Sequence, residues 1–113
     1  MLITPDQMQY LPDPNTVATT DLDAYRANLR KIHAFTGPDV RLMAVIKSNA
    51  YGHGMTACAH AAVDAGAAML GVCFASEGIA LRHAGIEAPI LALGPESYDA
   101  IPSMIEHDIA CGL

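Results

Sequence analysis

Four short apolar runs alternate with helix-like stretches along most of this 113-residue chain. The runs begin near residues 42, 69, 90 and 109. They lack the alternation of polar and apolar residues that is typical of a strand with one solvent-exposed face. Apolar strands separated by helices are typical of βα units in a parallel sheet. Because crossover connections are right-handed, this pattern predicts either a barrel or a doubly wound sheet.

Capping signals bound the first two helices. Asp21 is expected to cap a helix that Gly37-Pro38 ends, with apolar residues at spacings of three and four. Gly52 and Gly54 lead into a second helix, over 55–65, and Gly66 is expected to close it.

Two further helices follow. Ser76 is expected to cap a helix that runs to Ala84, and Glu77 in its first turn is interpreted as a complement to the helix dipole rather than a general base. A last helix contains Tyr98 and Ile105, although Pro102 obscures where it begins. The final apolar run breaks off at Leu113 with no helix after it, so the sheet is expected to be unfinished and the chain truncated.

Composition excludes several classes of function. Six basic residues against twelve acidic ones give a net charge of −6, which argues against a nucleic-acid surface. No stretch of 18 apolar residues occurs, so we expect no transmembrane helix, and no secretory signal is visible. The three cysteines are expected to be buried small hydrophobes in a reducing cytoplasm rather than a disulfide framework.

One of the only two lysines occupies a chemically informative position. Lys47 stands where the first apolar run ends, in the segment AVIKSNAYGHG, and the carboxyl ends of parallel strands are where α/β folds bind ligands. Partial desolvation there would favour the neutral amine that Schiff-base chemistry needs. The alternative is a lysine that extends from a strand end to water. The other lysine, Lys31, lies in a solvated helix and is assigned no function.

Other polar residues give weaker signals. Gly52 and Gly54 before a helix favour anion binding, but the same sequence also suits an ordinary strand-to-helix turn. Cys58 and His60 face apart on a helix, so we expect no metal site. His33 and His83 fall near helix carboxyl ends, where capping is the simpler interpretation.

The string MAVIKSNAYGHG resembles the pyridoxal-phosphate lysine motif of alanine racemases. The resemblance extends upstream through DLDAYRANL and downstream through EGIALRHAGIEAPILALG, and so covers roughly residues 17–113. It implies an α/β fold, about the first half of a (β/α)8 TIM-like barrel, preceded by an irregular lead-in arm over residues 1–16. The carboxy-terminal β-domain of that family has no counterpart in this sequence.

Site residues follow from the resemblance position by position. Lys47 matches the lysine that forms the internal aldimine with pyridoxal 5′-phosphate and serves as one of two acid/base groups. Tyr51 matches the tyrosine whose hydroxyl reaches the cofactor phosphate, and Leu93 an apolar residue near the cofactor ring. Ser48 departs from the family's more usual alanine, which bears on substrate preference, and Thr19-Thr20 replaces a commoner acidic-aliphatic pair.

The resemblance implies a function for the protein that contains this segment. It is interconversion of L- and D-alanine by two-base proton transfer at Cα, in a cytoplasmic homodimer that supplies D-alanine for bacterial cell walls. The second base, a tyrosine of the partner's β-domain, lies outside this sequence, so the isolated chain is expected to be inactive. No nucleic acid, membrane or metal is implied.

Three alternatives remain open at this point. The chain is a racemase segment for another small amino acid such as serine, or a truncated, non-catalytic module that binds the cofactor or a protein. A cofactor-carrier protein of related barrel type is the third, and the intact NAYGHG continuation disfavours it.

Overall fold

The structure, a computed structural model, describes residues 16–112. Its centre is one sheet of four parallel strands in the order β1-β2-β3-β4. The strands are β1 (Met43–Val45), β2 (Met69–Val72), β3 (Ile90–Ala92) and β4 (Ile109–Cys111). Each predicted apolar run therefore contains a strand, and the parallel α/β arrangement is confirmed. Apart from Thr16, the predicted lead-in arm over 1–16 lies outside the described residues.

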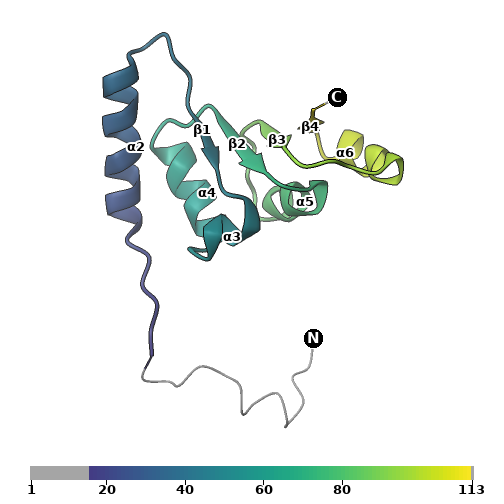
Figure 1. Cartoon of the computed structure of the whole chain (residues 1–113), viewed down its shortest axis with the longest axis horizontal. Coiled ribbons are helices and arrows are strands. Elements are labelled where there is room, and N and C mark those ends of the chain that lie inside the picture. Colours follow the sequence, from purple (N-terminus) through teal and green to yellow (C-terminus); the bar gives the residue numbers. More distant parts are fainter. Residues whose placement is uncertain (1–15, 113) are drawn as a thin grey trace.

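Helices connect the strands and lie along one side of the sheet, while α2 stands beside α4 at the β1 edge (Figure 1). The elements are α2 (Leu22–Thr36), α3 (Lys47–Tyr51), α4 (Met55–Asp64), α5 (Ala75–His83), the 3-10 turn η1 (Tyr98–Ala100) and α6 (Ile101–Glu106). Pro102 lies in the first turn of α6, where its missing N–H costs no helical hydrogen bond.

The ends of α2 follow the sequence signals. An Asp21 side-chain oxygen accepts a hydrogen bond from the Ala24 N–H at 2.9 Å, which is the predicted N-cap. Gly37 ends the helix with φ +87°, a conformation that favours glycine. Among the apolar residues of α2, Leu22, Tyr25 and Leu29 pack against the core. The helix is held to the domain through this apolar stripe.

Two predictions of detail were wrong. Ser76 does not cap α5, because the N-cap residue is Phe74, two residues earlier, and the helix begins at Ala75. Carboxylates of Glu77 and Glu96 accept from N–H groups at this helix start instead. Among the cysteines only Cys58 is buried, whereas Cys73 is half-buried and Cys111 is exposed. Cys111 is exposed because it lies on β4, at the edge of the described sheet.

The core lies between the sheet and helices α4 and α5. One row of strand side chains, at Leu70, Val72, Ile90 and Ala92, is fully buried against the helices. The facing positions of α4 are small, with Cys58, Ala59, Ala61 and Ala62 buried. Side chains of this size let a helix backbone approach the sheet closely, which explains why an alanine-rich chain still packs well.

The opposite face of the sheet carries apolar side chains without a helical cover. Val45 pairs in register with Gly71, which pairs with Leu91. A Cβ atom at Gly71 would lie 3.1 Å from Leu93 Cδ1, 3.3 Å from Val45 Cγ2 and 3.4 Å from Met43 Sδ. These three side chains therefore converge over a glycine and stay about two-fifths exposed, at 45%, 38% and 40% respectively.

Within residues 16–112, none of the helices combines the length and the apolar character that crossing a bilayer requires.

Candidate functional site

The chain winds with left-handed helical geometry immediately after β1. Ser48, Asn49, Ala50 and Tyr51 have φ between 52° and 55°, and together with Lys47 they form α3. For residues with a Cβ atom this conformation costs roughly 1–2 kcal/mol each. Four in succession require strong support from their surroundings, and such strain clusters at functional sites. The local geometry therefore marks this turn as a candidate site.

Backbone and side-chain hydrogen bonds hold the turn in place. The Ala50 N–H donates to the Ile46 carbonyl oxygen at 2.8 Å, and the Asn49 carbonyl oxygen accepts from the N–H groups of Gly52 and Gly54 at 3.1 and 3.0 Å. Asn49 also accepts through Oδ1 from the Met55 N–H at 2.8 Å, which caps α4. Asn49 thus links the left-handed turn to the start of the next helix.

Glu77 of α5 connects this turn to the neighbouring strand. Its Oε1 accepts from the Ser48 N–H at 2.7 Å. Its Oε2 accepts from the N–H groups of Cys73 and Phe74 at 2.6 and 3.2 Å. The predicted dipole position of Glu77 in the first helical turn is confirmed, but its contact with Ser48 was not predicted.

The three site residues predicted from the sequence lie at one edge of the sheet. Lys47 is half-buried and begins α3 directly after β1, while Tyr51 ends α3 and is 62% exposed. Leu93 follows β3, and its N–H donates to the Val72 carbonyl oxygen at 2.8 Å. Because carboxyl ends of parallel strands share an edge, the fold brings all three to the same rim. Lys31, in contrast, is exposed on α2.

A cavity of about 630 Å³ adjoins this rim, between α2 and the β1–α3 segment. Tyr51 and His53 line it from the turn, and Tyr25 and Asn28 line it from α2. Burial raises the pKa of the Cys58 thiol, which also lines the cavity. Burial, and secondly the charge of Cys58, raise the pKa of Tyr25. Both groups therefore favour their neutral forms here.

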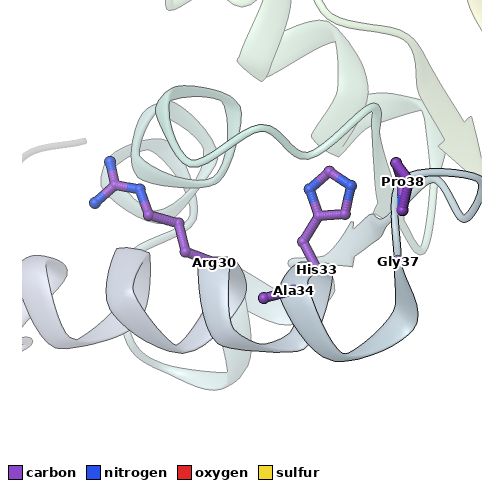
Figure 2. Close-up of a pocket in the computed structure, with 5 residues that line it drawn as sticks. All are labelled: Arg30, His33, Ala34, Gly37 and Pro38. Carbon is purple, nitrogen blue, oxygen red and sulfur yellow. The ribbon is translucent and has the colours of Figure 1, made fainter.

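A second cavity lies at the carboxyl end of α2 and contains none of the predicted site residues. It has a volume of about 380 Å³ and is lined by Arg30, His33, Ala34, Gly37 and Pro38. Figure 2 shows Arg30 and His33 projecting from the same side of the helix. This cavity lies away from the carboxyl rim of the sheet, because the carboxyl end of α2 leads into the amino end of β1.

The donor set at the rim suits a phosphorylated aldehyde cofactor. Lys47 provides a primary amine that reacts with a carbonyl carbon, and the Tyr51 hydroxyl can donate to a phosphate oxygen. Leu93, with Val45 and Met43, provides an apolar surface for an aromatic ring. Among residues 16–112 no group of three or more His, Cys, Asp or Glu side chains is arranged to hold a metal ion.

Comparison with known proteins shows the family that the chain matches. Residues 20–113 match the family model described as alanine racemase, N-terminal domain. The chain is 49% identical over 85 residues to an alanine racemase of Nostoc sp., an alignment that covers 72% of this chain and 22% of that protein. It is 46% identical over 97 residues to alanine racemase 1 of Bacillus subtilis, covering 84% and 24% respectively.

Solved structures show the same arrangement of elements. The crystal structure of alanine racemase from Bacillus anthracis with bound L-Ala-P matches with a TM-score of 0.80 at 44% identity, covering 81% of this chain and 24% of that one. The alanine racemase of Streptomyces lavendulae matches with a TM-score of 0.76 at 46% identity, with the same coverage. The chain thus spans about a quarter of the length of these relatives, and the four strands correspond to part of a barrel.

Proposed function

Because the chain belongs to the alanine racemase N-terminal domain family, we propose that it forms the cofactor-binding part of a racemase that interconverts L- and D-alanine. The observation that carries the proposal is Lys47 at the start of a hydrogen-bonded left-handed turn, at the carboxyl end of β1. The full-length relatives are named alanine racemases, which supports alanine as substrate.

Pyridoxal 5′-phosphate is the cofactor that these residues fit. Lys47 would hold it covalently through Nζ, Tyr51 would donate a hydrogen bond to its phosphate, and Leu93 would lie against its ring. When bound, the cofactor supplies an electron sink that makes the Cα proton of an amino acid acidic. Each of these roles rests on the residue type and on its place at the shared rim.

Racemisation requires a proton to leave Cα on one side and to return on the other. The Lys47 amine would take the proton on one face and, once protonated, could return it on that face. A group on the opposite face is needed for inversion, and we propose that a partner subunit of a homodimer supplies it. We therefore expect the 113 residues by themselves to show no appreciable racemisation. For the whole enzyme we propose a cytoplasmic location and a role in supplying D-alanine for cell walls.

A labelling experiment tests the site assignment. The chain is incubated with pyridoxal 5′-phosphate and reduced with borohydride, and the modified lysines are mapped by peptide mass spectrometry. We expect labelling at Lys47 in large excess over Lys31, because only a shaped site distinguishes two primary amines. The variant Lys47→Arg should lose the specific label, whereas the control Lys31→Arg should keep it.

Two outcomes would contradict the proposal in different ways. Equal labelling of Lys31 and Lys47 would refute the assignment of a cofactor site at Lys47. Specific labelling of Lys47 in a longer protein that does not racemise alanine would instead support a non-catalytic cofactor-binding module.

A further inference from the structure

We propose that Glu77 is a positioning residue for Lys47, an inference that rests on the proposed function of Lys47. Glu77 comes from α5, one βα unit beyond the lysine, yet its Oε1 accepts from the Ser48 N–H at 2.7 Å. The same carboxylate is anchored on the far side by the N–H groups of Cys73 and Phe74. It therefore bridges the chain after β1 and the chain after β2.

The bridge acts on the peptide group that Lys47 and Ser48 share. The Ser48 nitrogen is bonded to the carbonyl carbon of Lys47, so a fixed acceptor for this N–H fixes the plane of that peptide. Rotation of the peptide would carry the Lys47 backbone, and with it the origin of the side chain, away from the rim. Ser48 is also the first left-handed residue, with φ 53°, so the bond favours the strained turn at the point where it begins.

The contact with Ser48 is not needed to begin α5. The N–H groups near the helix start already have acceptors, since Glu77 Oε2 accepts from Phe74 and a Glu96 oxygen accepts from Ala75. Within residues 16–112, the Glu96 carboxylate accepts no hydrogen bond from the Lys47 turn, so Glu96 is a suitable control. A purely structural role at the helix start predicts similar consequences for the loss of either carboxylate.

Both carboxylate oxygens of Glu77 are required for the bridge. All three of its partners are N–H donors, and a carboxamide has only one oxygen to offer. In Glu77→Gln the amide nitrogen must therefore face an N–H group on one side. Glu77→Asp keeps the charge but shortens the side chain by one carbon. It can still accept from Phe74, three residues earlier, but no longer reaches Ser48.

The test compares the full chain with Glu77→Gln, Glu77→Asp and Glu96→Gln. Each is labelled with pyridoxal 5′-phosphate and borohydride, and the ratio of label on Lys47 to label on Lys31 is measured. Both Glu77 variants should lower this ratio by about ten- to a hundredfold, the range expected for one charge-assisted hydrogen bond. Glu96→Gln should leave it within about twofold, because a single N–H donor is satisfied by the remaining amide oxygen.

Amide hydrogen exchange provides a second readout that does not depend on the cofactor. Exchange at the Ser48 N–H should accelerate in both Glu77 variants, while exchange within α5 stays as in the unsubstituted chain for Glu77→Asp. An unchanged labelling ratio in both Glu77 variants would overturn the positioning role while leaving Lys47 as the site. An equal loss in Glu96→Gln would also overturn it. Equal labelling of the two lysines in the unsubstituted chain would instead refute the proposed function itself.

Discussion

The guanidinium group of Arg82 donates from Nη2 to the backbone carbonyl oxygen of Asp108 at 2.9 Å, directly before β4. Its Nε donates to the His107 carbonyl oxygen at 2.9 Å, and its Nη1 donates to those of Ile86 and Ala88, both at 2.8 Å. One side chain of α5 thus binds the segments that lead into both β3 and β4. Arg82 therefore ties the loops before β3 and β4 to α5, in addition to the ladders that pair these strands within the sheet.

We expect Arg82→Lys to destabilise the fold by about 2–4 kcal/mol, because an ammonium group cannot replace a planar group that donates in four directions. The measurement is the free energy of unfolding in denaturant. Arg41→Lys, at an exposed position in the loop before β1, is the matched control and should change it by less than about 0.5 kcal/mol. Similar losses in the two variants would contradict the role assigned to Arg82.

A glycine substitution tests the strain in the left-handed turn. Ser48→Gly should leave the free energy of unfolding unchanged or raise it by up to about 1 kcal/mol, because relief of the positive φ offsets the greater freedom of the unfolded chain. Ala57→Gly, at an exposed position inside α4, should lower it by about 1 kcal/mol. A loss at Ser48 as large as that at Ala57 would argue against strain there.

Adding one methyl group at Gly94 should be costly. A Cβ atom there would lie 2.6 Å from the Cys73 carbonyl oxygen, which accepts from the Gly94 N–H at 2.7 Å. Since the obstacle is backbone rather than a flexible side chain, we expect Gly94→Ala to lower the free energy of unfolding by about 1–3 kcal/mol. Gly112→Ala has no atom within 4 Å of its added carbon and should be nearly neutral. Thermal unfolding of both variants checks this difference.

Alkaline pH should destabilise the packing of α2 on α4. Burial raises the pKa values of Tyr25 and Cys58 above their ordinary values of 10.0 and 9.0, so the folded chain holds these protons more tightly than the unfolded chain. Their contribution to stability is complete at neutral pH and is lost as the pH rises through the raised values. Free energies of unfolding at pH 7 and pH 10 should therefore differ, with the lower value at pH 10.

Removal of one titrating group tests the origin of this decline. Tyr25→Phe should make the decrease in stability between pH 7 and pH 11 shallower, since the phenol no longer ionises. Tyr98→Phe is the control, because Tyr98 is 90% exposed. This substitution should leave the decrease in stability unaltered. An identical pH dependence in Tyr25→Phe and the unsubstituted chain would show that other groups cause it.

Periodicity and capping signals predicted most of the fold. The apolar runs located all four strands, and Asp21 and Gly37 located the ends of α2, because these signals act through neighbours in the sequence. The start of α5 was misplaced because Ser76 is a good cap by type. The N–H groups there are instead met by carboxylates from Glu77 and Glu96, and the latter is 21 residues away from its donor.

The predicted site was incomplete for a related reason. Lys47, Tyr51 and Leu93 were identified by resemblance to a family, and the fold brings them to one rim. The left-handed turn could not be predicted, because Ala50 and Tyr51 have no intrinsic preference for positive φ. The contact of Glu77 with the Ser48 N–H was missed because it spans 29 residues. Asn49 within the left-handed turn and Gly52 directly after it adopt positive φ more readily than other residues, and they were the sequence signal for this turn.

The contact between Ser48 and Glu77 also determines how this chain tolerates recombination. Donor and acceptor belong to successive βα units, so a chimera of two related proteins with its junction between residues 48 and 77 takes one partner from each parent. Such a chimera keeps the hydrogen bond only where both parents hold the two groups at the same separation. The stability effects of substitutions on the two sides of the junction should therefore be non-additive. We therefore expect chimeras with a junction between residues 48 and 77 to be less stable than those with a junction outside this range, although the range joins two separate βα units.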